Sequence, residues 1–524
     1  MSHNSHLIKI KRVLISVSDK TGIIELARDL RKHKVEIIST GGTSKALKDA
    51  GIPVMDISEV TGFPEMLDGR VKTLHPKIHG GLLAVRANKE HMDTIAKHGI
   101  TPIDMVIVNL YPFEKTISNP NCKFEDAIEN IDIGGPSMIR SAAKNFHGVC
   151  VVVNPAFYPE IIAELEKTNG CIGQETRDRM MIEVFKQTYQ YDMAIYNYFS
   201  KQVIKEEMPV MFNCSYKKAQ GLRYGENPHQ KASFYVDPAS KEPSVSKAKQ
   251  LHGKELSYNN IMDTNAAVEL VKEFEEPACA IIKHTNPCGT AVGKDIDEAF
   301  RKAYETDALS AFGGIIALNR KVTKTIAEYL AGKFIEVVVA PEYEKSAIEV
   351  FEQKKNIRLL IIDGLGKIGV RDTDYDVRKV VGGLLVQDRD LKGITNADLL
   401  TVTKIAPSAE EIKDMLFGWK VVKHVKSNAI VVVKGGVTIG VGAGQMNRVG
   451  SVKIAVAQAG KFAKGAVLVS DALFPKPDAV EEAVKAGISA IIQTGGSIND
   501  KDVIESANKA GIAMVFTNIR HFKH

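Results

Sequence analysis

Two glycines flanked by hydroxyl side chains form the first segment whose residue types could do chemistry. Residues 39–43 read STGGT; they end the apolar run VEIIST and precede the helical pattern SKALKDAG. Glycines let backbone N–H groups approach an anion, hydroxyls add donors, and a helix N-terminus adds a positive partial charge. The segment is therefore a candidate phosphate cradle. An ordinary glycine-rich turn with a Ser or Thr N-cap explains the same residues.

Cationic and imidazole side chains are concentrated in residues 68–81, DGRVKTLHPKIHGG. The segment has too little apolar content for a core strand, so it is either a solvated loop or a site for an anionic substrate, with Arg70 as a forked donor. His75 and His79 have the i,i+4 spacing of a metal-binding pair. Pro76 between them disfavours a continuous helix and no third ligand is evident, so we predict no metal site.

An isolated acid precedes a Gly-Gly-Pro turn in residues 132–137, DIGGPS. Asp132 lies before the turn, and Arg140 and Lys144 lie on the helical stretch that follows it. An anion-binding helix start and a plain loop-to-helix junction both fit this pattern.

Two donor-rich segments lie further along the chain. Residues 223–230, RYGENPHQ, form either a ligand-binding loop or a solvent-exposed loop. Lys283 and His284 follow the apolar strand end AII. A histidine at the mouth of a strand can act as a general base near neutral pH, and an adjacent lysine can stabilise a developing negative charge. A structural histidine is the alternative.

Several common metal and cofactor patterns are incomplete in this sequence. Zinc deaminases combine H-x-E with P-C-x-x-C, whereas here Asn286 stands where Glu is needed and Cys288 has no second cysteine. Residues 440–448, GVGAGQMNR, lack the full G-x-G-x-x-G spacing, and no G-x-x-x-x-G-K-[ST] occurs. The sequence therefore disfavours zinc deamination and dinucleotide or ATP sites of these types.

Alternating strands and helices must position the candidate residues in the first third of the chain. Apolar runs predict four strands, over residues 12–17, 35–40, 103–113 and 148–154. A helical face made of Ile23, Leu26, Ala27 and Leu30 follows the first of them. Strands separated by helices imply parallel βαβ units. A helical pattern over 177–200 closes this part, so we expect domains 1–200 and 201–524, with the polar stretch 201–209 at the boundary.

The second part contains a candidate internal repeat. The run AIIKH at 280–284 is echoed by KVVKH at 420–424, and each is followed by Asp-Ala-Leu, at 307–309 and 471–473. Chance explains this thin identity as well as duplication does. A genuine repeat would mean two similar α/β subdomains packed together.

Composition excludes several classes of protein. The chain has 524 residues, 44% hydrophobic and 25% charged, which fits a soluble globular protein of roughly two to four domains. A net charge of +6, a single tryptophan and the lack of a basic run argue against nucleic-acid binding. The six cysteines have no CxxC spacing, and no stretch reads as a signal peptide or membrane span. We expect a cytoplasmic protein that binds neither nucleic acid nor membrane.

Taken in order, these segments resemble the family of bifunctional purine enzymes that combine AICAR transformylase with IMP cyclohydrolase. The resemblance runs from SVSDKTG at 16–22 to TNIRHFKH at the C-terminus. It is carried by STGGT, DGRVKTLHPKIHGG, NLYPF, DIGGPSMIRSAAKN, LRYGENPHQ, KHTNPCG, SAFGGIIAL, SNAIVVV, GAGQMNRV and GGSI. The resemblance implies an α/β fold: an N-terminal methylglyoxal-synthase-like parallel-sheet domain, then two cytidine-deaminase-like α/β subdomains without zinc. It also implies a homodimer with transformylase sites at the subunit interface.

For ring closure of FAICAR to IMP, the resemblance implies that Lys144 transfers a proton and that Lys72, Tyr111 and Asp132 belong to the site. The family's nucleotide-binding positions correspond to Ser18, Asp19, Lys20, Thr40, Gly41, Gly42, Thr43, Arg70, Val71, Thr73, Val108, Asn109 and Ile133. The reaction is attack of a carboxamide nitrogen on a formamide carbonyl of the same molecule, followed by loss of water. Holding the substrate folded therefore meets much of the barrier.

For formyl transfer, the resemblance implies that His284 takes a proton from the attacking amine of AICAR and that Lys283 stabilises the tetrahedral intermediate or its leaving group. The positions that hold the ribonucleotide correspond to Arg223, Tyr224, Phe312, Gly313, Glu336, Asn428, Arg448 and Arg520. The implied cosubstrate is 10-formyltetrahydrofolate, and no metal is implied. Its contacts fall near Val449, Leu473, Phe474, Gly495 and Gly496.

The chain departs from the family in the folate region. It has LFPK at 473–476, where members often have FFPF, and TGGS at 494–497, where many bacterial members have PGGS. Two alternative functions are an enzyme that keeps only cyclohydrolase activity and a nucleotide-sensing protein, because methylglyoxal-synthase-like domains also serve as effector modules. The intact Lys283, His284, Asn428 and Arg520 count against the first. The intact Lys72, Tyr111, Asp132 and Lys144 count against the second.

Overall fold

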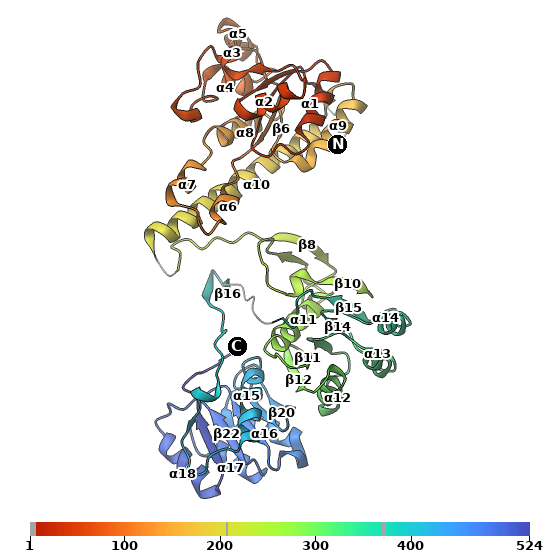
Figure 1. Ribbon diagram of the computed structural model, residues 1–524, viewed down its shortest axis with the longest axis vertical. Helices are drawn as coiled ribbons and strands as arrows, with labels where there is room; N and C mark the ends of the chain where they lie inside the picture. Colours follow the sequence, from red (N-terminus) through yellow and green to blue (C-terminus); the bar gives the residue numbers. More distant parts are fainter. Residues whose placement is uncertain (1–6, 206–207, 368–373) are drawn as a thin grey trace. The chain divides into compact units, whose positions relative to one another are not determined.

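The computed structural model describes residues 7–205, 208–367 and 374–524 (Figure 1). The first residues of the N-terminal stretch (1–6) and residues 206–207 of the expected boundary segment lie outside the described residues. The chain forms two compact units, Met1–Ser215 and Tyr216–His524. The helical segment that closes the first unit continues to Ile204, so this division lies beyond the expected boundary after residue 200. Within the described residues, no helix is long and apolar enough to cross a membrane.

The N-terminal unit is built on a five-stranded parallel sheet with the order β4-β3-β2-β5-β6. Its strands are β2 (Arg12–Val17), β3 (Glu36–Ser39), β4 (Met55–Asp56), β5 (Met105–Asn109) and β6 (Cys150–Val152). The four predicted strands are confirmed, and the strand expected over 103–113 ends at Asn109. A separate antiparallel pair joins β1 (Ile8–Lys9) to β7 (Cys171–Ile172).

Helices cover both faces of this sheet. Successive side chains of a strand point to opposite faces, so each strand contributes to both cores. Val13 and Ile15 of β2 lie in one core cluster, and Leu14 lies in the other. The first face is covered by α1 (Ile23–Lys32), α2 (Gly41–Asp49) and α9 (Tyr158–Lys167). The second face is covered by α4 (Pro76–Leu83), α8 (Gly134–Lys144) and α10 (Gln174–Phe199). The shorter helices are α3 (Ile57–Thr61), α5 (Lys89–Lys97), α6 (Phe113–Ile117) and α7 (Phe124–Glu129).

The C-terminal unit contains two six-stranded sheets of the same design. Their orders are β10-β15-β14-β13-β11-β12 and β18-β23-β22-β21-β19-β20. In both, the successive pairings are antiparallel, parallel, parallel, antiparallel and antiparallel. The expected duplication is therefore confirmed by topology. We call residues 216–367 the first half and residues 374–524 the second half.

The elements of the two halves follow one another in the same order. Those of the first sheet are β10 (Lys249–His252), α11 (Tyr258–Val271), β11 (Ala278–Lys283), β12 (Asn286–Val292), α12 (Ile296–Thr306), β13 (Ile315–Leu318), α13 (Lys324–Ala331), β14 (Val337–Ala340), α14 (Lys345–Glu352) and β15 (Arg358–Ile361). Those of the second are β18 (Leu400–Thr401), α15 (Ala409–Val422), β19 (Ile430–Val433), β20 (Thr438–Gly442), α16 (Arg448–Ala459), β21 (Val467–Ser470), α17 (Asp478–Lys485), β22 (Ala490–Gln493), α18 (Asp500–Ala510) and β23 (Ala513–Phe516). Two hairpins add β8 (Lys217–Leu222) with β9 (Ala232–Val236) and β16 (Tyr375–Val380) with β17 (Gly383–Asp388).

The alignment of the two Lys-His pairs, which suggested the repeat, is wrong because the pairs do not occupy equivalent positions in the two halves. Lys283 ends strand β11, whereas Lys423 is the C-cap of helix α15. The strand equivalent to β11 is β19, which begins only at Ile430. A short apolar run fits a buried strand and a buried helix end equally well, so the shared letters do not mark equivalent positions.

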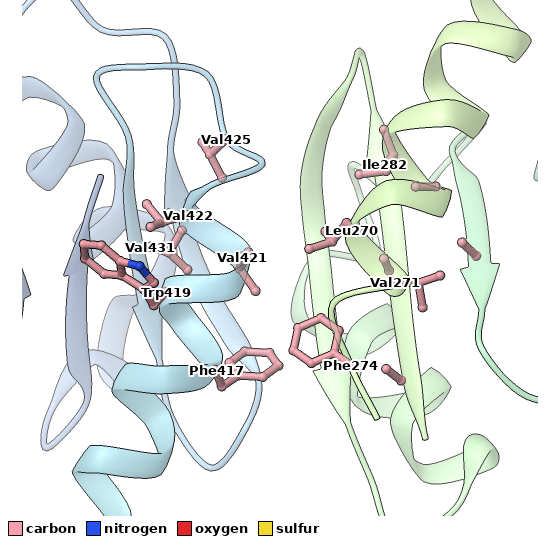
Figure 2. Close-up of a cluster of buried hydrophobic side chains, with 14 of the residues drawn as sticks. Leu270, Val271, Phe274, Ile282, Phe417, Trp419, Val421, Val422, Val425 and Val431 are labelled. Carbon is pink, nitrogen blue, oxygen red and sulfur yellow. The ribbon is translucent and has the colours of Figure 1, made fainter. Parts of the chain in front are cut away.

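The two halves share one core. Helices α11 and α15 lie between the sheets, and Phe274 of the first half faces Phe417 of the second at a ring distance of 5.3 Å (Figure 2). The sheets also meet at their edges, where Val292 N donates to Gly436 O at 3.0 Å. The outer faces have their own clusters, under α12–α14 and under α16–α18. The C-terminal unit is thus one packed body made of two related halves.

Candidate functional site

A cavity of about 580 Å³ opens at the carboxyl edge of the N-terminal sheet. It is bordered by the ends of β2 and β5, by the starts of α2 and α8, and by residues 69–73. Twelve of the predicted site residues line it: Ser18, Lys20, Gly42, Thr43, Arg70, Lys72, Thr73, Val108, Asn109, Tyr111, Asp132 and Ile133. Segments far apart in the sequence therefore meet at one place.

The topology explains why the cavity is there. Helices α1 and α2 cover one face of the sheet, and α4 and α8 cover the other. The helices that follow neighbouring strands β2 and β5 thus lie on opposite faces, which leaves a crevice between the strand ends. Open α/β sheets bind their ligands at such switch points.

The start of helix α2 is suited to an anion. Thr40 is its N-cap residue, yet the Thr40 side chain makes no capping hydrogen bond and instead pairs with Ser16 Oγ at 2.9 Å. A Cβ placed on Gly42 would lie 3.9 Å from Lys20 Nζ, and one on Gly41 would lie 3.8 Å from Lys72 Nζ. Two ammonium groups therefore flank a helix start whose first N–H groups receive no side-chain cap. This arrangement favours the phosphate cradle over the plain turn.

Two predicted binding residues hold the loop after β2. Asn109 Oδ1 accepts the N–H groups of Ser18 at 2.6 Å and Asp19 at 2.9 Å. Thr43 Oγ1 lies 3.0 Å from both the nitrogen and the oxygen of Val17. Their polar atoms are thus engaged with backbone, so Asn109 and Thr43 shape the cavity wall.

Arg70 forms an ion pair with Glu129, and both side chains are more than half exposed. Glu129 also lines the cavity and was not predicted from the sequence. It lies in the short helix α7, where an exposed glutamate is an ordinary surface residue. An exposed pair of this kind contributes little stability, so an anionic ligand can replace Glu129 as the partner of Arg70.

Asp132 is the acid of this cavity. Its Oδ1 accepts Gly135 N at 2.8 Å, and its Oδ2 accepts Tyr111 N at 3.4 Å. Burial raises the pKa of Asp132, and those two N–H groups and the charge of Lys72 offset only part of that effect. A Cβ on Gly135 would lie 2.5 Å from Asp132 Oδ2, so a larger residue here would displace the carboxylate. A carboxylate held in place with a raised pKa is suited to accept a proton.

The remaining predicted residues of the N-terminal unit lie outside the cavity lining. Asp19, Gly41 and Val71 are chain neighbours of residues that line it, and Thr40 lies two residues before Gly42. Lys144 is exposed at the C-terminal end of α8, about 15 Å along the helix from Gly134 at the cavity. Its role in proton transfer stays a prediction.

The two histidines of the cationic segment have separate structural tasks. His75 is the N-cap of α4 and accepts Lys77 N at 3.2 Å through Nδ1. His79 Nδ1 lies 3.0 Å from Ser141 Oγ, and burial lowers the pKa of His79. Across the described ranges, no three His, Cys, Asp or Glu residues are grouped to hold a metal ion.

A second group of candidate residues surrounds Lys283 at the end of β11. Lys283 Nζ donates to the carbonyl oxygens of Phe312 at 2.9 Å and Gly313 at 3.2 Å. His284 and Thr285 both have left-handed backbone angles, with φ of 52° and 61°. The turn after the strand is therefore tight and carries the imidazole at its tip.

This turn contacts the second half directly. Asn286 Oδ1 accepts the N–H of Lys426 at 3.0 Å, which brings the segment before Asn428 beside the Lys283–His284 turn. Asn428 Nδ2 donates to Gln445 O at 2.7 Å. The duplicated halves thus bring residues of both to one place. Asn286, which stands where a zinc deaminase would have Glu, is thus a structural link between the halves.

The other predicted transformylase residues have local partners. The Arg223 guanidinium lies 4.8 Å from the Tyr224 ring, and that of Arg520 lies 4.4 Å from the Phe522 ring. Glu336 forms a 2.6 Å ion pair with Arg358.

The predicted folate contacts are unequal in their access to solvent. Phe474 is fully buried in the outer core of the second half, whereas Val449 and Leu473 are partly exposed. Gly495 and Gly496 have left-handed backbone, with φ of 72° and 94°. Gly496 N donates to Asp500 at 2.7 Å. Of the neighbours Leu473 and Phe474, Leu473 is therefore the one whose side chain is accessible to a ligand.

Comparison with known proteins covers nearly the whole chain. Residues 142–458 match the model of the AICARFT/IMPCHase bienzyme, and residues 22–137 match the MGS-like domain. The bifunctional purine biosynthesis proteins PurH of Bacillus cereus (strain AH820), Bacillus anthracis and Bacillus thuringiensis (strain Al Hakam) are each 56% identical over 514 residues, which is 98% of this chain and 100% of theirs. A solved structure described as the crystal structure of ForH is 33% identical, with a TM-score of 0.35, and the match covers 37% of this chain and 98% of that one.

Proposed function

The chain belongs to the AICARFT/IMPCHase bienzyme family, and on that premise we propose which of its parts carry out the two reactions. It is a bifunctional enzyme of the last two steps of purine biosynthesis, with AICAR transformylase and IMP cyclohydrolase activities. We assign cyclisation of FAICAR to the N-terminal cavity and formylation of AICAR to the group around Lys283 and His284. The cavity at the switch point carries the first assignment, because it combines an anion-binding helix start with a buried carboxylate. Family membership over the full length favours the bifunctional enzyme over the cyclohydrolase-only and sensor alternatives.

In ring closure, one end of the cavity binds the phosphate and the other does the chemistry. The start of α2 with Lys20 binds the phosphate of FAICAR. The carboxamide nitrogen attacks the formyl carbon and loses a proton to Asp132. Lys72 stabilises the negative charge that develops on the formyl oxygen. That oxygen takes up the proton from Asp132 and the proton that the formamide nitrogen loses, and it leaves as water as its C–O bond breaks and the ring C=N bond forms. Because both reacting groups belong to one molecule, holding it folded supplies much of the rate.

In formyl transfer, the 5-amine of AICAR attacks the formyl carbon of 10-formyltetrahydrofolate. His284 accepts the proton that the amine loses, and the folate nitrogen leaves with a proton after the C–N bond breaks. The carbonyl oxygens of Phe312 and Gly313 orient the Lys283 ammonium, which stabilises the negative charge of the tetrahedral intermediate. Arg223, Tyr224, Glu336, Asn428, Arg448 and Arg520 hold the ribonucleotide in this proposal, and Val449, Leu473, Gly495 and Gly496 lie nearest the folate.

The setting of the enzyme is also part of the proposal. We place it in the cytoplasm as a homodimer that binds AICAR, FAICAR, IMP and folate and neither nucleic acid nor membrane. Neither reaction requires a metal ion, since proton transfer and fixed charges supply the catalysis. Sedimentation of the purified chain, and activity after chelation, test the dimer and the metal independence.

The function is tested by incubating the purified chain with AICAR and 10-formyltetrahydrofolate and following IMP. Formation of IMP is expected; no IMP, with supplied FAICAR also unconverted, would contradict the function.

His284→Ala is expected to stop formylation and leave cyclisation of supplied FAICAR intact, and Asp132→Asn is expected to do the reverse. Loss of both activities in either folded variant would refute two separate sites. Lys144→Ala causes FAICAR to accumulate if Lys144 transfers a proton, and normal IMP formation removes it from the mechanism.

A further inference from the structure

The carboxyl group of Asp471 lies where three segments of the second half meet. Asp471 directly follows β21, and its side chain is fully buried. We propose that Asp471 is a positioning residue of the transformylase, which holds the ribonucleotide-binding groups in place from the interior. This inference rests on the proposed function, because the binding roles of Asn428, Arg448 and Arg520 come from it.

One carboxylate oxygen of Asp471 pairs with Arg448. Arg448 Nη1 donates to Asp471 Oδ1 and, at 3.0 Å, to the carbonyl oxygen of Ala429. The Arg448 side chain is only 4% exposed, and its Nε has no hydrogen-bond partner among the described residues. A guanidinium buried this deeply requires a countercharge, because an unpaired interior charge is strongly disfavoured. Asp471 supplies that charge and fixes the direction of the guanidinium.

The second carboxylate oxygen fixes the segment that carries Asn428. Asp471 Oδ2 accepts the hydroxyl of Ser427, the residue before Asn428. From the other side, Ser451 Oγ donates to the Asn428 carbonyl oxygen at 2.8 Å. The backbone of Asn428 is thus held between Asp471 and the first turn of α16, on which Arg448 is the first residue.

The same residue also anchors the C-terminal segment. The carbonyl oxygen of Asp471 accepts the N–H of His521 at 3.0 Å, directly after Arg520. Ser427 Oγ accepts the N–H of Lys523 at 3.1 Å, so the hydroxyl held by Asp471 binds this segment too. One buried aspartate therefore connects the chain segments of three residues that are to bind an anionic ribonucleotide, and its own side chain is closed off from solvent.

Asp471→Asn tests the proposal in the full-length enzyme. The amide keeps the shape and one acceptor oxygen but removes the countercharge of Arg448. We expect the KM for AICAR to rise about tenfold or more, as for loss of a charge-assisted hydrogen bond, while the KM for 10-formyltetrahydrofolate stays within about twofold. Cyclisation of supplied FAICAR serves as an internal control and remains unchanged. An unchanged KM for AICAR, or an equal rise for both substrates, overturns the proposal.

Folding is checked in the same samples. Trp419 is the only tryptophan of the chain and lies buried in the core between the halves, so its fluorescence reports unfolding of the C-terminal unit. Asp414→Asn is the matched control, because Asp414 accepts the N–H groups of Gly435 and Gly436 beyond the opposite end of β19. This variant is expected to leave both KM values unchanged. If Asp471→Asn does not fold, Ser427→Ala removes the hydroxyl that links Asp471 to the Asn428 segment and to Lys523, and it leaves the Arg448 pair in place. An unchanged KM for AICAR in that variant overturns the proposal.

A further variant separates this inference from the proposed function. Arg448→Gln removes the charge that is to bind the ribonucleotide. If Arg448→Gln leaves the KM for AICAR unchanged, the site assignment itself fails. If it raises the KM for AICAR and Asp471→Asn does not, the site assignment stands and only the positioning role of Asp471 is refuted.

Discussion

The pKa of Asp132 is raised by burial and lowered by three contacts, and the effect of burial is the larger. Removal from water raises the pKa of this carboxyl, while the N–H groups of Gly135 and Tyr111 and the ammonium of Lys72 lower it in part. A carboxylate must be deprotonated to accept a proton from the carboxamide nitrogen. With Asp132 as the proposed proton acceptor, the acidic limb of the cyclohydrolase pH profile is expected to lie above the ordinary pKa of aspartate.

This gives a prediction with a defined sign. For supplied FAICAR, kcat/KM should fall on acidification at a pH above the ordinary aspartate pKa of about 3.9. Lys72→Met removes the one positive charge that opposes burial, so the acidic limb should move to higher pH, whatever the loss in rate. Asp132→Asn should abolish the limb along with most of the activity. A limb that stays in place in Lys72→Met would exclude Asp132 as its origin.

Helices and strands with a clear periodic apolar pattern were predictable from the sequence. The places where these elements contact one another in the fold were not. The strands at 12–17 and 148–154 and the helical face of Ile23, Leu26, Ala27 and Leu30 follow from local apolar patterns alone. The cavity forms because the helices that follow β2 and β5 lie on opposite faces of the sheet. The order of strands in a sheet cannot be predicted from the pattern of any single segment. The Lys423–His424 echo was misleading because an apolar run does not distinguish a helix end from a strand end. Glu129 and Asp471 were missed because their roles come entirely from tertiary contacts.

The turn between β11 and β12 depends on a helix of the same half. Asp263 of α11 accepts Thr285 N at 2.7 Å, and it thereby stabilises two consecutive left-handed residues that each cost about 1–2 kcal/mol. Asp263→Ala should reduce kcat for formyl transfer by roughly 10- to 100-fold, since His284 loses its fixed position. Asp263→Asn keeps the acceptor oxygen and should restore most of the rate.

A control and a contrary outcome make this test specific. Asp295 accepts Glu298 N at 2.8 Å as the N-cap of α12, in the same half. Asp295→Ala also removes a carboxylate that accepts a backbone N–H, and it should lower stability without this loss of kcat. Equal kcat in Asp263→Ala and the unaltered enzyme would show that the turn holds His284 without Asp263.

At the scale of the whole molecule, one group of buried charges lies where the two halves of the C-terminal unit join. Glu273 of the first half lies 3.0 Å from Lys423 Nζ and 3.3 Å from His424 Nε2 of the second. Burial alone would raise the pKa of Glu273, but its contacts with His424 and Lys423 hold that pKa well below its usual range. Burial lowers the pKa of His424 to about 4, aided by the charges of Lys523 and Lys423 and only partly opposed by Glu273. At neutral pH the carboxylate is therefore paired with lysine, and the imidazole is neutral.

Acid should consequently loosen this unit well above the pH at which carboxylates titrate. Between pH 7 and pH 5 the unfolded chain takes up a proton at His424 and the folded chain does not, so the free energy of unfolding falls as pH falls, by about 2 kcal/mol from this group. Urea unfolding followed by Trp419 fluorescence measures it in the C-terminal unit, where the single tryptophan lies. His424→Gln cannot take up that proton, so its stability should decline less over the same range. If the free energy of unfolding depends on pH equally in the unaltered protein and in His424→Gln, His424 is protonated as readily in the folded state as in the unfolded chain. In that case water reaches the junction between the halves.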